Sequence, residues 1–411
     1  MPLSVSRYVY LSTLLGIFSG VLFIYLGSTI FFFYIIMLSN LLLMWGFLRP
    51  LIFPKWFAWL MIYLAASSFI GIARGTDTVF LAGKQIAAIG LSALYFANFF
   101  HLEDNEIDRA WATYAKLAYR LTLLALAMWV VQCWLKHGFV RLHGITAEPS
   151  SYCVLTLPAY YWYAHQWWSK GKHRKEVLWI ALGVALSVSS DGYLAVIFGL
   201  VLLFGKKMTS LALSVAIASG LAISVYMISP QVHLRVDDTF SALVGNDVSG
   251  TNLSTYALIS NMFVTGRVLE VHPLLGNGLG SHVKSGKKYI EDVPGEQIVE
   301  ASGWDAGANL HDASSLTLRT LSELGISGFI AILFFILYFR VKGNSDRAAI
   351  SGAILTVFFQ KLLRGGGYAN PEQFFFILIY MLNYRYFRLE KRDSMIATQE
   401  HSPGFSMLQN P

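Results

Sequence analysis

Charged residues are scarce in this chain of 411 residues: Asp, Glu, Lys and Arg together make up 13% of it, whereas hydrophobic residues make up 55%. A globular domain normally carries about 25% charged residues, so the composition excludes an ordinary soluble protein. The chain holds long apolar runs instead, and about 20 apolar residues are enough to cross a bilayer. The sequence therefore predicts an all-α polytopic membrane protein with about 12 transmembrane helices. The runs lie at residues 8–26, 29–48, 56–73, 79–100, 112–136, 149–168, 177–190, 192–205, 209–228, 324–340, 348–363 and 373–387.

Cysteine is almost absent, since the chain has only Cys133 and Cys153. Both lie near the predicted outer ends of adjacent spans and could form a bridge, but an unpaired cysteine commonly behaves as a small buried hydrophobic residue. The histidine spacings HxxxH and HExxH, which zinc sites use, do not occur either. We therefore expect no metal ion and no cofactor.

The few basic residues are distributed unevenly. If the N-terminus is inside, the predicted cytoplasmic segments hold seventeen Lys and Arg residues and the short external segments hold five. Because Lys and Arg near span ends stay in the cytoplasm, both termini are expected there. The net charge of +7 then reflects topology and attraction to anionic lipid rather than nucleic-acid binding.

This orientation divides the chain into four parts. Residues 1–228 carry spans one to nine, and residues 229–315 form a large, partly helical periplasmic loop. Residues 316–390 carry spans ten to twelve, and 391–411 form a polar cytoplasmic tail that we expect to be disordered. Chemistry is expected in the external segments, where side chains have access to water.

Two external segments carry candidate catalytic groups. Arg141 and Glu148 lie between the fifth and sixth spans, with Pro149 at the first turn of the next helix. The alternative is an Arg that snorkels and a carboxylate that favours the helix dipole. His311 precedes Asp312, a predicted helix N-cap, and a neutral imidazole at the membrane surface suits a general base. A hydrogen-bonded surface histidine is the alternative there.

Three glycines in the large loop, Gly276, Gly278 and Gly280, are expected either to make tight turns or to let backbone amides approach an anion.

Basic residues predict a binding site for a lipid diphosphate. Lys361 and Arg364 are spaced i and i+3, so they share one face at the outer end of the eleventh span. With Arg141 and Arg267 they could form a basic pocket at the outer surface of the membrane.

With these motifs the chain resembles the superfamily of O-antigen polymerases (Wzy-type) and O-antigen ligases, bacterial membrane glycosyltransferases. The resemblance covers nearly the whole chain in architecture and implies a GT-C-like fold. The motifs are Arg141 followed by Glu148-Pro-Ser, Gly266-Arg267 leading to the glycine-rich turn, and His311 ahead of Glu323-Leu-Gly-Ile-Ser-Gly. Arg267 and Gly278 also match an Arg-x10-Gly spacing of the polymerases, whereas the Arg141 segment has Tyr152 at the glycine position.

The resemblance implies a metal-independent, inverting glycosyltransferase in the bacterial inner membrane. Its donor would be a glycan on undecaprenyl diphosphate at the periplasmic face. Arg141 and Arg267 would bind the diphosphate leaving group, His311 would take the proton of the acceptor hydroxyl, and Glu148 would be the reserve base or orient it.

The motifs favour a polymerase, whose acceptor is a second lipid-linked repeat unit, and implied partners are a chain-length regulator and a flippase of the same pathway. A ligase that uses lipid A–core as acceptor is the alternative. A lipid-linked oligosaccharide flippase is a second alternative, but transporters usually have related halves and polar residues at mid-membrane.

Overall fold

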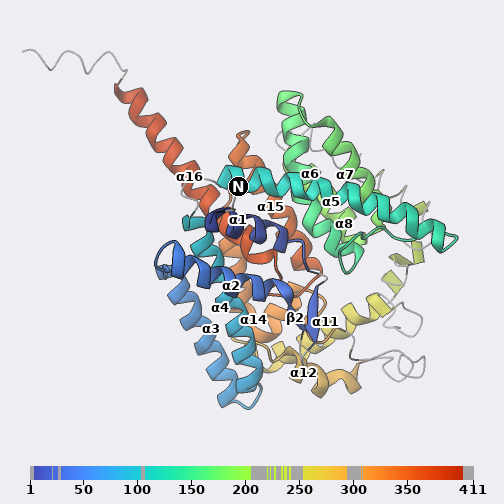
Figure 1. The fold of residues 1–411 in the computed structure, drawn as a ribbon. Coiled ribbons are helices and arrows are strands. Elements are labelled where there is room, and N and C mark those ends of the chain that lie inside the picture. The colour runs from blue at the N-terminus through green and yellow to red at the C-terminus, as the bar shows by residue number, and fades with distance from the viewer. Residues whose placement is uncertain are drawn as a thin grey trace, which may run out of the picture.

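A computed structural model describes residues 4–20, 22–25, 29–102, 107–204, 253–293 and 309–400, together with isolated positions at 220–241 and 307. Most of the ninth apolar run and large parts of the predicted loop lie outside the described residues. The residues described form helices, one small hairpin and the turns between them (Figure 1). Its elements are α1 (Val5–Gly16), β1 (Phe23–Tyr25), β2 (Thr29–Phe31), α2 (Phe32–Phe47), α3 (Lys55–Ala73), α4 (Val79–Leu102), α5 (Ile107–Leu135), α6 (Pro149–Lys170), α7 (Arg174–Ser187), α8 (Ser190–Phe204), α11 (Leu253–Val271), α12 (His282–Tyr289), η1 (Ile290–Asp292), α14 (Leu316–Tyr338), α15 (Asp346–Leu363) and α16 (Gln373–Glu400).

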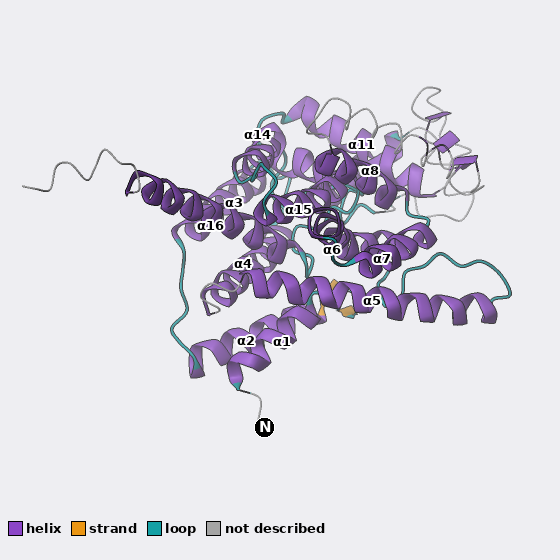
Figure 2. Ribbon diagram, turned by 90° about the horizontal axis from the view of Figure 1, so that it is seen from above, coloured by secondary structure: helices purple, strands orange, loops and turns teal. Residues whose placement is uncertain are grey.

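Four of the described helices, α3, α4, α5 and α14, are long and apolar enough to cross a membrane. Helix α2 and residues Ser190–Leu202 of α8 are shorter apolar helices. These features are those of a helical membrane protein. The helices are not parallel rods, since α5 lies across α6 in both ribbon views (Figures 1 and 2).

Two predicted boundaries differ from the structure. The first apolar run was expected to be one helix over 8–26, but α1 ends at Gly16 and is followed by the antiparallel pair β1–β2, in which Phe23 is opposite Phe31. Pairing between the two strands satisfies only the backbone groups that face the partner strand. At the other end, residues 391–400 continue α16 instead of starting a disordered tail.

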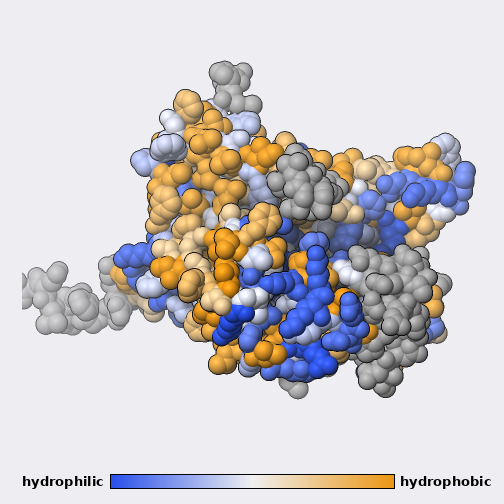
Figure 3. Space-filling model, turned by 90° about the horizontal axis from the view of Figure 1, so that it is seen from below, coloured by the Kyte–Doolittle hydropathy of each residue, from blue (hydrophilic) through white to orange (hydrophobic). Residues whose placement is uncertain are grey.

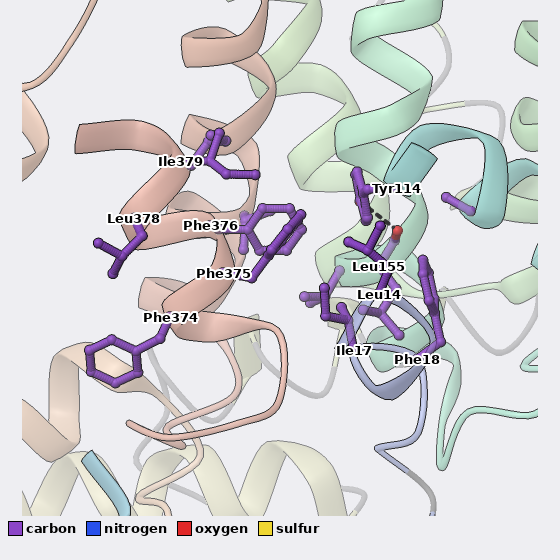
Figure 4. Close-up of a cluster of buried hydrophobic side chains, with 14 of the residues drawn as sticks. Leu14, Ile17, Phe18, Tyr114, Leu155, Phe374, Phe375, Phe376, Leu378 and Ile379 are labelled. Atoms are coloured by element: carbon purple, nitrogen blue, oxygen red, sulfur yellow. Dashed lines mark hydrogen bonds between the residues drawn. The ribbon is translucent and has the colours of Figure 1, made fainter. Parts of the chain in front are cut away.

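The main apolar core brings the first described helix, α1, together with the last, α16. Leu14 of α1, Tyr114 of α5, Leu155 of α6, and Phe375 and Phe376 of α16 meet there (Figure 4), and all five side chains are buried. The Tyr114 hydroxyl donates a hydrogen bond to the Leu155 carbonyl at 2.7 Å, which satisfies the buried phenol as apolar surroundings require. This core fixes α16, and with it the turn that connects α15 to α16.

Some polar contacts between distant segments lie near opposite ends of the molecule. At the end that holds the α6–α7 turn, Lys170 and Arg347 bind Asp346 and Asp108 respectively. At the opposite end the α3–α4 turn contacts the segment before α12, where the Thr76 hydroxyl donates to the carbonyl of Asn277. In each of these contacts, segments that are distant in the chain meet one another.

Candidate functional site

The C-terminal end of α15 joins several of the predicted functional segments. The Gln360 side-chain amide donates to the Ser150 carbonyl at 3.3 Å and to Asp191 Oδ2 at 2.8 Å. It thereby ties α15 to the first turns of α6 and α8. The helix ends at Leu363, its C-cap residue Arg364 has an extended backbone, and Gly365 follows with φ +87°. The next glycine, Gly366, has no room for a Cβ because the Asp312 backbone lies against it.

Arg141 lies beside this junction, in the segment between α5 and α6. Its half-buried guanidinium donates from Nε to the Ser187 carbonyl at 3.2 Å and from Nη2 to the Val188 carbonyl at 2.8 Å. These two backbone carbonyls fix the orientation of the Arg141 guanidinium beside the α7–α8 turn.

Glu148 occupies the N-cap position of α6, with Pro149 at the first helical position, and its side chain is exposed. The Ser150 hydroxyl donates to Glu148 Oε1 at 2.5 Å. Because Gln360 binds the carbonyl of the same Ser150, Glu148 lies within two residues of the α15 contact.

His311 is also exposed and lies in the turn that precedes α14. The N-cap of α14 is Ser315, and the expectation that Asp312 would cap the helix was wrong. Asp312 Oδ1 instead accepts from the Ser314 backbone amide at 3.0 Å, within the turn. The Gly365 amide donates to the Ser314 carbonyl at 3.1 Å, so the His311 turn packs against the end of α15.

Two further predicted ligands on α15 have defined partners. Arg364 donates from both terminal nitrogens to the Ser254 carbonyl, at 3.3 and 3.2 Å, and holds the start of α11. Lys361 forms a buried ion pair with Glu372 at 2.7 Å, and the two side chains are 5% and 9% exposed. A buried ammonium already compensated by a carboxylate does not suit the expected role of Lys361 as a diphosphate ligand.

Arg267 stands apart from this junction. It is exposed on α11, pairs with Glu270 at 3.0 Å and lies over the Phe263 ring. Ser254, which Arg364 contacts, is thirteen residues earlier on the same helix, which corresponds to roughly 20 Å at 1.5 Å per residue. The structure therefore does not bring all four predicted cations into one pocket.

The three loop glycines form tight turns. Gly276, Gly278 and Gly280 have φ values of +62°, +101° and +93°, a region that glycine adopts without strain. The Asn277 and Gly278 amides donate to the carbonyls of Ser322 and Glu323, both at 2.9 Å. Because α14 already uses these two amides, close packing rather than anion binding explains this turn.

The same loop stabilises a break in α14. Gly325 has φ +67° and interrupts the helix, and the amides of Ile326 and Ser327 donate to the carbonyls of Pro273 and Leu274. Gly325 could be recognised in the sequence as a residue of a motif, but its role as a break depends on the position of residues 273–278.

Sequence reasoning gave no role to a buried ion pair in α14. Arg319 Nε binds Glu323 Oε1 at 3.1 Å, and the side chains are 5% and 1% exposed. The guanidinium also donates to the Gly366 carbonyl at 3.0 Å and lies 4.5 Å from the Tyr368 ring centroid. The signal available was an Arg and a Glu four residues apart at the start of an apolar run, where a charge usually has a partner.

Two buried ionisable residues, His282 and Asp77, lie beside the glycine turn. His282 exchanges hydrogen bonds with Ser322 at 2.6 Å and Asn261 at 2.7 Å, and burial lowers its pKa to about 3, so the ring is neutral. Burial raises the pKa of Asp77, in the α3–α4 turn, to about 6. Nothing in the spacing of either residue could have revealed these surroundings.

Polar surface gathers at this end of the molecule. Seen from the end that holds α12, the surface has a hydrophilic patch bordered by apolar side chains (Figure 3). In the part of the chain that the structure describes, no group of three or more His, Cys, Asp or Glu could hold a metal ion, and Cys133 and Cys153 are unpaired with each other.

No protein-family model and no curated protein matches the chain.

Proposed function

We propose that this protein is a polymerase of a bacterial surface polysaccharide. It would transfer a glycan from undecaprenyl diphosphate to another lipid-linked repeat unit at the periplasmic face of the inner membrane. The observation that carries the proposal is the junction at the end of α15, where the segments of Arg141, Glu148, His311 and Arg364 adjoin one another.

In this proposal Arg141 and Arg364 bind the donor diphosphate. A planar guanidinium can contact phosphate oxygens through two parallel hydrogen bonds, and its charge stabilises the diphosphate as it leaves. No nucleotide is required, because the bond between sugar and diphosphate supplies the free energy. Lys361 is left out of the donor site because Glu372 neutralises it.

His311 is the proposed general base, which accepts the proton of the acceptor hydroxyl as that oxygen attacks the anomeric carbon. Its exposed position gives it access to an acceptor sugar. Glu148 is the weaker candidate, since its carboxylate already accepts a hydrogen bond from the Ser150 hydroxyl at the start of α6.

Arg267 is assigned to the diphosphate of the acceptor. A polymerase binds two lipid diphosphates, and the reacting end of the acceptor glycan lies a whole repeat unit from its own diphosphate. A separation of roughly 20 Å along α11 fits that arrangement.

The test uses purified protein in nanodiscs with a synthetic lipid-diphosphate oligosaccharide as the only substrate. A ladder of longer glycans is expected from the wild type. Arg141→Ala and Arg267→Ala should both abolish the ladder, but donor binding should be lost only in Arg141→Ala. The matched control is Arg174→Ala, an exposed arginine in the α6–α7 region at the opposite end. Normal ladders from both site variants would refute the proposed roles.

The base is tested in the same assay. His311→Ala should lower the rate by about 10²- to 10⁴-fold while donor binding persists, and Glu148→Gln should have a smaller effect. An active His311→Ala beside an inactive, donor-binding Glu148→Gln would move the role to Glu148.

The three related activities are separated in a strain that lacks the gene. Loss of the polymerase leaves single repeat units on lipid A–core, whereas loss of a ligase leaves accumulated lipid-linked polymer. Loss of a flippase leaves lipid-linked repeat units on the cytoplasmic side.

A further inference from the structure

Helix α5 exposes two cations that no described residue compensates. Lys116 and Arg120 are exposed, whereas Tyr114 and Ala118, on another face of the helix, are buried. Neither cation forms a hydrogen bond or an ion pair with a residue that the structure describes. Being four residues apart, the two side chains are neighbours on the helix surface. Because α5 is a candidate membrane span, where a charge normally has a partner, we expect the compensating anion outside the described chain.

The exposed face that carries the two cations continues as an apolar stripe. Four exposed apolar side chains follow Arg120 at intervals of three or four residues, the period of a helix face; they are Leu123, Ala127, Val131 and Trp134. Trp134, at the far end, is 73% exposed. From Lys116 to Trp134 the helix rises roughly 27 Å, close to the thickness of about 30 Å of a bilayer hydrocarbon core. This half of α5 extends past α6 and α7 in both ribbon views (Figures 1 and 2).

The two halves of this face require different surroundings. A helix that lies flat on a membrane has its cations and its apolar residues on opposite faces, whereas here they follow one another along one face. The helix therefore runs from the level of lipid headgroups into the hydrocarbon. Near the cations, Tyr119 interacts electrostatically with Tyr163 of α6, which interacts in turn with Glu176 of α7. The adjoining α6–α7 turn exposes Lys172 and Arg174, so the cations lie near a polar turn.

The chemistry of this face selects an anion that carries an apolar tail. The side chains of Lys116 and Arg120 can only donate hydrogen bonds, and a phosphate accepts from both, with two parallel bonds from the guanidinium. A soluble anion would leave the apolar stripe unused. In a phospholipid the acyl chain begins at the level of the phosphate and fills one leaflet, which is roughly 15 Å deep. From Arg120 that depth corresponds to roughly ten residues of helix, which includes Leu123 and Ala127.

We propose that this face of α5 binds an anionic phospholipid. Its phosphate lies between Lys116 and Arg120, and an acyl chain follows Leu123 and Ala127. Trp134 then lies near the opposite boundary of the bilayer, where tryptophan is enriched in membrane proteins. A zwitterionic lipid carries its own cation beside the phosphate, so it gains less from these two side chains. The site does not depend on the proposed polymerase activity.

The experiment measures lipid selectivity beside α5 in phosphatidylcholine nanodiscs. The protein lacks its native cysteines and carries one fluorophore, either at Ala127→Cys or at Ile330→Cys on the exposed face of α14. The quencher is phosphatidylglycerol or phosphatidylcholine with the same brominated chains, at the same low mole fraction. The label at 127 should report a preference of roughly 10- to 30-fold for phosphatidylglycerol, the effect of two cations at a membrane surface. The label at 330 should report less than about 2-fold.

Substitutions locate the phosphate. Lys116→Gln and Arg120→Gln should each lower the preference at 127 by about 3- to 5-fold, and their combination should abolish it. Exchanging the two cations, with Lys116→Arg and Arg120→Lys together, should preserve it. The matched control is Arg388→Gln with Lys391→Gln, a pair of exposed cations on α16 that is followed by Asp393 rather than by an apolar stripe. This control should leave the preference unchanged.

Three results would overturn the proposal. If the wild type shows no preference at 127, the anion beside Lys116 and Arg120 is not a lipid, and an acidic partner protein takes its place. An equal preference at 127 and 330 would reflect general attraction of anionic lipid to the protein. Loss of the preference in millimolar glycerol phosphate would show that the acyl chain contributes nothing and that the site binds a soluble phosphate.

Discussion

Two ion pairs of the same length but different burial give a sharp test of this structure. Lys361–Glu372 and Lys170–Asp346 both have an N–O distance of 2.7 Å. The side chains of the first pair are 5% and 9% exposed, and those of the second are 45% and 51% exposed. Removing one partner of a buried pair leaves an uncompensated charge and costs about 3–5 kcal/mol. An exposed pair contributes only about 0.2–1 kcal/mol.

The perturbations are Lys361→Met, Glu372→Gln and their combination, with Lys170→Met, Asp346→Asn and their combination as controls. Each change in the buried pair should lower the free energy of unfolding by about 3–5 kcal/mol. The double variant should lose much less than the sum, because neither charge remains. Equilibrium unfolding in mixed micelles with increasing SDS measures all six variants.

The coupling energy of the double-mutant cycle decides the outcome. We expect at least about 2 kcal/mol for the buried pair and less than about 1 kcal/mol for the exposed pair. Equal coupling in the two cycles would refute the burial of Lys361. The activity of the Lys361→Met/Glu372→Gln double variant is a second readout. A stable but inactive protein would indicate that Lys361 belongs to the donor site.

Three further predictions concern the end of the molecule near α12. Burial raises the pKa of Asp77 from 3.8 to about 6, so the folded protein binds this proton more tightly than the unfolded chain does. The resulting contribution to the free energy of unfolding is fully present below pH 4 and is lost as the pH rises through 6. Asp77→Asn should therefore exceed the wild type in stability by up to about 3 kcal/mol at pH 8 and match it at pH 4, and a difference independent of pH would contradict this. Gly276→Ala should destabilise the protein by at least about 1–3 kcal/mol more than Gly75→Ala, because both have positive φ but only the Gly276 Cβ would meet backbone, at 2.6 Å; equal thermal shifts would exclude the close approach. In a protein without its native cysteines, Lys288→Cys should react with an impermeant thiol reagent from outside and Lys172→Cys only after permeabilisation, and external labelling at 172 would reverse the topology.

Much of the helical pattern could be predicted from the sequence, because apolar runs and their ends are local signals. The run at 56–73 matches α3, Lys55–Ala73, and Pro149 begins α6 as expected. The break after Gly16 could not be predicted in this way, since residues 8–26 remain apolar across it. Hydropathy reports the environment of a segment and does not distinguish a helix from a small hairpin.

The site was less predictable because its residues depend on partners far away in the chain. Lys361 and Arg364 were expected to act together, but Glu372 binds one and Ser254 the other. Ser315 and Asp312 are both good helix caps, and tertiary contacts determine which one is used. The distance of Arg267 from the α15 end depends on how α11 is anchored, which no spacing in the sequence encodes.

The anchoring of α11 has a consequence for biosynthesis. Arg364 holds Ser254 across 110 residues of chain, and Asn277 is bound by Thr76, 201 residues earlier. Contacts this remote in sequence form late, because closing so long a segment of chain costs conformational entropy. A nascent chain that has emerged only as far as α14 contains all four long apolar helices but lacks the arginine that positions α11. We therefore expect the junction to form at the end of synthesis, when α15 has joined the other helices.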